Sequence, residues 1–290
     1  MITSTKPLLS RYDKAFKEDY TRNYHLTIRV SPDGFSFVVF SLDKNRYLGL
    51  ETFQIKRIDQ QAKLAAALDE LCILRQWITY PFHSVVVIVD NTFNTLIPVS
   101  LYEEKEKGVY LAFNQEFQDN SRIQSDLLKA AEAYNLYYLP NPLVEKVKDI
   151  WANARIVHLQ SVLVESLLIT HRNQQSDQTA FIHLRHDNFD LIVLKNDKLL
   201  FINNFRFNTP EDFIYFVLFS FDQLRLNPET VQVVLSGIIE KGSKTYDILF
   251  QYVRNIRFAE RNPTFEYSYI LEDIPVHQHF IIYNALQCEL

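Results

Sequence analysis

Histidine and cysteine side chains are candidates for chemistry in this sequence, because imidazole and thiolate groups bind metals and act as catalytic bases and nucleophiles. Two histidine pairs occur, His183 with His186 and His277 with His279. Neither pair has a nearby cysteine or lies in a His-Glu-x-x-His segment, so we interpret these side chains as surface or hydrogen-bonded histidines and expect no metal site. The two cysteines, Cys72 and Cys288, are too far apart to form a metal-binding cysteine pair.

Asp90 is the strongest polar candidate in the first half of the chain. It ends the apolar run 85–89, and ligands gather at the carboxyl ends of strands in open α/β sheets. We favour the simpler interpretation, in which Asp90, Asn91 and Thr92 cap a turn through side-chain hydrogen bonds to the backbone. The sequence contains neither a Gly-x-Ser-x-Gly elbow nor a Walker A segment, so it offers no familiar nucleophile or phosphate loop.

Composition excludes several classes of protein. The chain has 290 residues, 47% of them hydrophobic and 22% charged, which predicts a folded protein with a large core. A net charge of -5 disfavours binding to nucleic acid, and the absence of long apolar runs argues against a signal peptide or a membrane span. We therefore expect a cytoplasmic protein. It has 5 glycines where about 20 are usual, which disfavours glycine-rich phosphate loops.

An internal repeat organises the sequence. Residues 28–44 (IRVSPDGFSFVVFSLDK) align without a gap on residues 182–198 (IHLRHDNFDLIVLKNDK), at an offset of 154 residues. Six pairs are identical: Ile28 with Ile182, Asp33 with Asp187, Phe35 with Phe189, Val39 with Val193, Asp43 with Asp197, and Lys44 with Lys198. Both copies predict a β-hairpin, because residues that tolerate tight turns separate two apolar stretches. Each half continues with a third strand, which makes a three-stranded meander.

A helix and a short buried strand follow the meander in each half. Helical spacing covers 59–78 and begins again at 209, and the apolar runs 84–89 and 231–235 predict strands buried on both faces. Further helices are predicted at 121–135, 142–152, 160–172, 243–253 and 275–287, with strands at 154–158 and 255–259. We predict a mixed α/β protein with an N-terminal arm at 1–23, a first lobe at 24–175 and a second lobe at 176–290.

This order of elements resembles a known fold. A duplicated β-β-β-α-β-α-β-α unit resembles the actin-like ATPase (ribonuclease H-like) fold of actin, Hsp70 chaperones, sugar kinases and the bacterial assembly proteins FtsA and PilM. The opening segment LTIRVSPDGFSFVVF is similar to that of a bacterial family of uncharacterised proteins with this fold. The resemblance implies a nucleotide held between the lobes. It also implies an Asp-x-Gly phosphate loop at the first turn of each half, and an adenosine loop with paired glycines after the buried strand of the second half.

The residues at these three places depart from the pattern. The first turn places Asp33 directly before Gly34, and Phe35 follows where the fold's ATPases carry serine or threonine, so we expect a bulky ring to crowd a phosphate. The second turn, at 186–189, contains no glycine, and the third place keeps a single glycine. The candidate nucleotide-binding residues are Ser31, Asp33, Gly34, Asp187, Asn188, Ser236 and Gly237.

These departures favour a protein that has lost ATPase activity. We expect a non-catalytic actin-like protein that works without a cofactor, through contacts with other proteins or with itself. The 22 phenylalanines and 16 tyrosines provide rings of the kind that anchor interfaces. The alternative is an ATP-binding enzyme or ATP-gated switch that holds ATP with Mg²⁺ between its lobes. A third possibility is a small-molecule binder that uses the interlobe space without phosphate chemistry.

Overall fold

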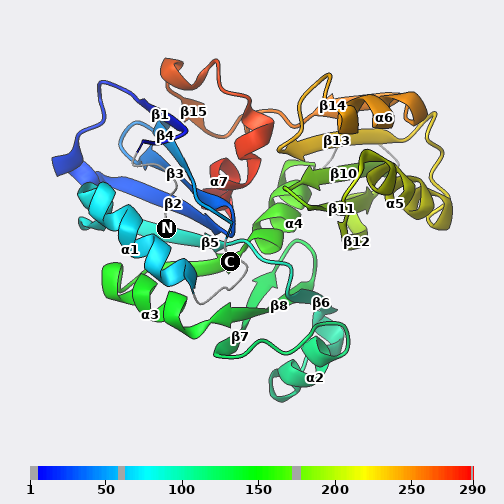
Figure 1. Ribbon diagram of the computed structural model, residues 1–290, viewed down its shortest axis with the longest axis horizontal. Coiled ribbons are helices and arrows are strands. Elements are labelled where there is room, and N and C mark those ends of the chain that lie inside the picture. The colour runs from blue at the N-terminus through cyan, green and yellow to red at the C-terminus, as the bar shows by residue number, and fades with distance from the viewer. Residues whose placement is uncertain (1–5, 58–62, 172–177, 289) are drawn as a thin grey trace. The chain divides into compact units, whose positions relative to one another are not determined.

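A computed structural model describes residues 6–57, 63–171, 178–288 and 290 (Figure 1). The chain divides into two compact units. Unit 1 comprises residues 1–166, 262–274 and 281–290, and unit 2 comprises residues 167–261 and 275–280. Each unit has its own sheet and its own hydrophobic core.

In the described part of unit 1, the main sheet has seven strands. Six follow the order β1-β4-β3-β2-β5-β9, and β15 pairs with β4. The main elements are β1 (Leu9–Tyr12), β2 (Tyr24–Ser31), β3 (Gly34–Ser41), β4 (Arg46–Gln54), α1 (Leu64–Leu74), β5 (Ser84–Val89), α3 (Asn141–Ile150), β9 (Arg155–His158), α4 (Leu159–Thr170) and β15 (Glu266–Tyr267). The division between the units falls within α4, after Ser166. Strands β2, β3 and β4 form an antiparallel meander, and β2, β5 and β9 run parallel.

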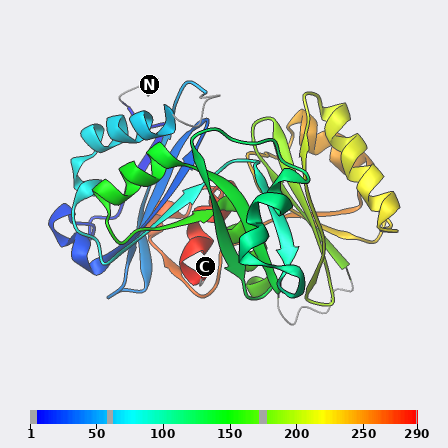
Figure 2. The same cartoon turned by 90° about the horizontal axis from the view of Figure 1, so that it is seen from below.

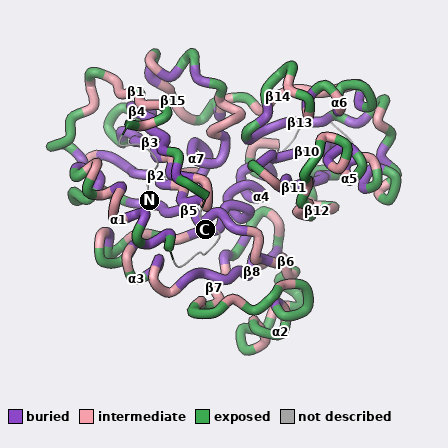
Figure 3. The backbone as a smooth tube through the Cα atoms, viewed as in Figure 1, coloured by how far each residue is buried: buried purple, intermediate pink, exposed green. Residues whose placement is uncertain are grey.

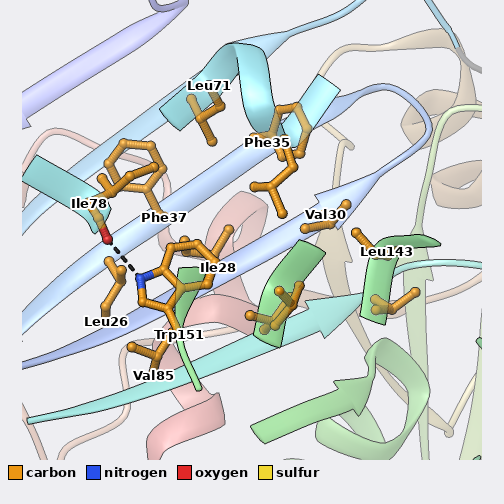
Figure 4. Packing of buried hydrophobic residues seen from close by; sticks show 14 of the residues in the cluster. Leu26, Ile28, Val30, Phe35, Phe37, Leu71, Ile78, Val85, Leu143 and Trp151 are labelled. Atoms are coloured by element: carbon orange, nitrogen blue, oxygen red, sulfur yellow. Dashed lines mark hydrogen bonds between the residues drawn. The ribbon is translucent and has the colours of Figure 1, made fainter. Parts of the chain in front are cut away.

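Alternating side chains explain how this sheet is covered. In β2 and β3, Leu26, Ile28, Phe35 and Phe37 are buried in one hydrophobic cluster together with residues of α1 and α3. Figure 2 shows α1 and α3 on the same face of the sheet, and Figure 4 shows Phe35 directed toward Leu71 of α1. Burying a side chain of this size contributes about 1.5–3 kcal/mol, so these rings hold the helices on the sheet.

A smaller sheet interrupts the repeat in unit 1. It has the order β6-β8-β7 and comprises β6 (Asn94–Pro98), β7 (Ser121–Leu128) and β8 (Ala133–Pro140), with the short helix α2 (Lys107–Ala112) packed on it. The helix predicted at 121–135 is therefore wrong. Ile123 and Leu127 imitate helical spacing, but they belong to a hairpin whose turn contains Glu132 at a φ of 51° and no glycine.

Unit 2 repeats the topology of unit 1 without that insertion. Its sheet has the order β12-β11-β10-β13-β14. The elements are β10 (Gln178–Leu184), β11 (Asn188–Lys195), β12 (Lys198–Arg206), α5 (Pro210–Gln223), β13 (Gln232–Gly237), α6 (Lys244–Tyr252) and β14 (Asn255–Phe258). Helix α5 begins with a capping box in which Thr209 and Asp212 exchange hydrogen bonds with each other's backbone. After β14 the chain passes through α7 (Phe280–Asn284), most of which belongs to unit 1.

Local details support the duplication. The β3–β4 register shifts between Val39 and Phe40, and the β11–β12 register shifts between Val193 and Leu194, again 154 residues later. The turn aspartates also have the same main-chain role. Asp33 O accepts a hydrogen bond from Ile55 N, and Asp187 O accepts one from Phe207 N, both at 3.0 Å. The predicted duplication of a mixed α/β lobe is confirmed, although the helix that would end the second copy, α7, lies mostly in unit 1.

The two units differ in extent from the segments predicted from the sequence. Residues 262–274 and 281–290 belong to unit 1, whereas the sequence placed them in the second lobe at 176–290. Residues 9–12 of the predicted N-terminal arm form β1, which pairs with β4, and Tyr12 stacks on Phe16 with ring centres 4.9 Å apart. Among the described residues, no helix is both long and apolar enough to cross a membrane.

Candidate functional site

The first predicted phosphate turn joins β2 to β3. Ser31 pairs with Gly34, so Pro32 and Asp33 alone form the turn. The Ser31 hydroxyl donates to Gly34 O at 2.9 Å and accepts from Gly34 N at 3.1 Å. The Asp33 carboxylate is half exposed and lies 3.8 Å from the Arg57 guanidinium. The polar groups that could face a phosphate are therefore largely occupied within the turn or by a neighbouring cation.

Gly34 has a structural role in this turn. A Cβ atom at this position would come well inside 3.0 Å of Phe53 O, on the neighbouring strand β4. The backbones of β3 and β4 can approach this closely because residue 34 has no side chain. Close strand pairing therefore accounts for Gly34 without a ligand.

The expectation that Phe35 crowds the first turn is wrong. Phe35 is 1% exposed, and its ring packs in the core on the α1 side of the sheet (Figure 4). Phe189, its repeat partner, is also buried in the core of its own unit, with its ring centre 4.9 Å from that of Phe213. Successive side chains of a strand point to opposite faces of the sheet. Phe35 and Phe189 occupy equivalent positions in β3 and β11, and at these positions the side chain points to the face that the helices cover.

The second predicted phosphate turn joins β10 to β11 in unit 2. Arg185 N donates to Asn188 O at 2.8 Å, which closes the turn around His186 and Asp187. The Asn188 side chain donates from Nδ2 to Asp187 Oδ1 at 2.8 Å and accepts from Asn204 Nδ2 at 3.0 Å. Asn188 is buried, so this amide fixes the turn from inside rather than presenting donors to solvent.

Ser236 and Gly237 end strand β13. Ser236 Oγ lies 2.9 Å from His183 Nδ1, and both side chains are buried. Gly237 has a φ of 85°, and a Cβ there would collide with Leu184 O on β10. The positive φ and the close approach both require glycine, so strand pairing accounts for this residue as well.

Of the seven predicted site residues, three belong to unit 1 and four to unit 2. Ser31, Asp33 and Gly34 lie together in one hairpin, as predicted. Asp187 and Asn188 likewise share one turn, and Ser236 and Gly237 end the neighbouring parallel strand β13. The assignment of these residues to nucleotide binding stays a prediction.

Sequence reasoning missed an ion pair in each unit. In unit 1, Arg29 of β2 donates from Nη2 to Asp90 Oδ2 at 2.5 Å, and Asp90 is 4% exposed. In unit 2, Arg185 donates to Asp190 Oδ2 at 2.7 Å, and Asp190 is fully buried. Asn204 donates to the other oxygen of Asp190 at 2.9 Å.

These ion pairs limit the ability of the two buried aspartates to bind a metal ion. The Asp90 carboxylate, the strongest polar candidate in the first half, is compensated by Arg29. The Asp190 carboxylate is compensated by Arg185 and Asn204, so neither acid is available as an uncompensated Mg²⁺ ligand. The two arginines are not equivalent in the repeat, because Arg29 aligns with His183 and not with Arg185. The alignment of the two halves therefore does not predict both ion pairs.

One histidine of each pair is held by another group. His277 Nε2 lies 2.8 Å from Ile239 O, and burial lowers the pKa of His277. His183 contacts Ser236, as described above. Among the described residues, no group of three histidine, cysteine, aspartate or glutamate side chains is arranged to hold a metal ion.

The fold is that of the actin-like ATPases. A Bacteroides thetaiotaomicron protein with an actin-like ATPase fold and unknown function superposes with a TM-score of 0.76 at 22% identity, over 84% of this chain and 93% of its own. The structure of the PilM–PilN type IV pilus biogenesis complex matches with a TM-score of 0.57 at 14% identity, over 92% of this chain and 98% of the matched chain.

The chain belongs to the family described as "Protein of unknown function (DUF3822)", whose model matches residues 13–256. The resemblance inferred from the sequence, to a family of uncharacterised proteins with an actin-like fold, is thereby confirmed. No curated protein matches the sequence.

Proposed function

We propose that this protein is a non-catalytic member of the actin-like fold that acts through protein contacts. The hydrogen bonding of the first turn carries the proposal. The Gly34 amide, a donor in the turn where the resemblance places a phosphate loop, already donates to Ser31 Oγ, and Ser31 returns a hydrogen bond to Gly34 O. Binding a phosphate here would require breaking these bonds, at a cost of about 0.5–1.5 kcal/mol each.

The ion pairs support the loss of catalysis. Phosphoryl transfer in this setting needs Mg²⁺ held by available oxygen ligands. Asp90 and Asp190 are both buried and each is bound by an arginine, so using either of them as a metal ligand would leave a guanidinium without its carboxylate.

Exposed apolar side chains support a role in protein contacts. The insertion in unit 1 exposes five of them between residues 99 and 117, namely Val99, Leu101, Val109, Phe113 and Phe117. Phe113 is 92% exposed and Phe117 is 74% exposed, and the surface around α2 is exposed in Figure 3. Clustered exposed apolar residues on a folded domain are typical of an interaction surface. The PilM–PilN structure is a precedent for a protein complex with a member of this fold.

The contact role is tested by comparing captured partners. Tagged wild-type protein and the Phe113→Ser/Phe117→Ser variant are cross-linked in the source organism, and the captured proteins are quantified by mass spectrometry. Ile73→Ser is the matched control, because Ile73 is 74% exposed on α1 of the same unit. We expect at least one captured protein, or a second copy of this chain, to be depleted by the double variant and retained by the control. Equal capture by all three proteins would contradict the role assigned to this surface.

The non-catalytic role is tested by measuring phosphate release from Mg-ATP. We expect no release above the buffer rate. Turnover by the wild-type protein that is abolished in Asp187→Ala, with an unchanged melting temperature, would establish the ATPase alternative instead.

A further inference from the structure

A polar pocket lies within unit 1, away from the turns. Its volume is about 290 Å³, and it is bordered by β7, the end of α3 and the outer edge of β9. Strand β9 is the last strand of its sheet, so one side of its backbone pairs with β5 and the other faces this pocket. Figure 1 shows α3 beside β7 in this part of the unit.

Three cations line the pocket, one from each bordering element: Arg122 of β7, Lys148 of α3 and Arg155 of β9. Arg122 Nε donates to the neutral Asn141 Oδ1 at 2.7 Å. Arg155 Nη1 donates at 2.8 Å to an oxygen of Leu290, the last residue of the sequence, and this contact occupies one of the five N–H donors and compensates part of the charge of this guanidinium. Within the described residues, no side-chain carboxylate lies within ion-pair distance of these three cations, although the chain as a whole carries a net charge of -5.

Among the described residues, Asp126 is the acidic side chain that lines the pocket, and other groups of the protein already donate hydrogen bonds to its carboxylate. It is 5% exposed, accepts from Tyr137 Oη at 3.0 Å and accepts from the His158 amide at 2.9 Å. Burial raises the pKa of Asp126 to about 6, so this carboxylate is still mostly ionised at neutral pH, but Tyr137 Oη and the His158 amide occupy its two oxygens. Leu290 and Asp126 compensate part of the charge of Arg155. Among the described residues, Arg122 and Lys148 have no carboxylate partner, so the positive field available to a ligand comes mainly from these two side chains.

We propose that this pocket binds a small anion carrying two or more carboxylate or phosphate groups. Arginine forks and a lysine ammonium are the groups that bind carboxylate and phosphate oxygens best, and Gln124 and Ser125 add neutral donors to the lining. The pocket volume is at the lower limit for small-molecule sites, which fits an anion the size of citrate or pyrophosphate. The inference is independent of the proposed function, because the pocket shares no residue with either turn.

Titration calorimetry with citrate and with pyrophosphate tests this site, against sodium chloride at the same ionic strength. We expect saturable binding of at least one anion, with affinity reduced about tenfold or more in Arg155→Gln and in Lys148→Gln. The matched control is Lys146→Gln, which removes the same charge from the same helix at a residue that pairs with Asp69. The control should change affinity by less than twofold, and melting temperatures establish that the variants are folded.

Three results would overturn the proposal. These are no saturable heat with either anion, equal weakening by Lys146→Gln and Lys148→Gln, or binding of a hexaglutamate peptide when neither small anion binds. The last result would assign the pocket to an acidic protein segment. Pyrophosphate binding that is unchanged in Arg155→Gln and in Lys148→Gln would place the anion outside this pocket and would also contradict the proposal.

Discussion

Replacing Gly34 with alanine separates a structural glycine from a ligand-binding glycine. The new Cβ would lie well inside 3.0 Å of Phe53 O, and would also lie 3.1 Å from Phe53 C and 3.2 Å from Gln54 Cα. All three are backbone atoms of β4, so no side chain can rotate away, and the β3–β4 pairing has to open locally. Overpacking costs about 1–3 kcal/mol and each lost hydrogen bond about 1 kcal/mol, which together give a destabilisation of about 3 kcal/mol.

Two other glycines provide matched controls. Gly242 has a φ of 83° but no atom within 4 Å of the position that an added Cβ would take, so alanine there should cost about 1 kcal/mol from backbone strain alone. Gly108 lies in α2 with its nearest neighbour 4.0 Å away, so alanine there should be neutral or stabilising by up to about 1 kcal/mol.

Scanning calorimetry of the three variants measures the effect. At about 2–4 °C per kcal/mol, Gly34→Ala should lower the melting temperature of its transition by about 6–12 °C, which is more than either control. A Gly34→Ala protein with wild-type stability would refute the structural explanation of this glycine. It would indicate instead that Gly34 is retained for close approach to a ligand.

Two further predictions concern buried acids. Because burial raises the pKa of Asp126 from 3.8 to about 6, the folded state binds the proton more tightly than the unfolded state, and stability should fall by about 3 kcal/mol as pH rises from below 4 to above 6. Chemical denaturation at several pH values should show this slope flattened in Asp126→Asn; an unchanged slope would contradict the assignment. Asp190→Asn leaves Arg185 buried without its carboxylate and should cost about 3 kcal/mol, whereas the double variant Arg185→Met/Asp190→Leu should recover much of that loss. Equal loss in the single and double variants, measured by the same denaturation experiment, would argue against an electrostatic origin.

The repeat made much of the fold predictable from the sequence. The aligned hairpins at 28–44 and 182–198 predicted both meanders, and the apolar runs 84–89 and 231–235 are the buried parallel strands β5 and β13. These elements depend on short-range patterns, namely alternation and turn residues, which the sequence displays directly.

Long-range contacts explain what the sequence did not predict. The return of residues 262–274 to unit 1 depends on pairings such as Glu266 with Arg46, which are 220 residues apart. The hairpin β7–β8 was missed because its turn contains none of the usual glycine or asparagine signals. Arg29 and Asp90 are 61 residues apart and meet because β2 pairs in parallel with β5.

One error at the predicted site was avoidable. Phe35, Phe37 and Val39 alternate with Ser36 and Val38, so the direction of the Phe35 ring toward the core could have been inferred from the period of the strand. The hydrogen bonds of Ser31 to Gly34 could not, because they depend on the conformation of a two-residue turn.

Titration calorimetry of the purified protein with Mg-ATP and Mg-ADP tests the central claim, that the two turns no longer bind nucleotide, most directly. We predict no saturable heat at either turn: any nucleotide heat should disappear in Arg155→Gln, which removes a cation from the separate pocket, and should be unaffected by Asp187→Ala. A micromolar dissociation constant that survives Arg155→Gln and is weakened at least tenfold by Asp187→Ala would contradict the account.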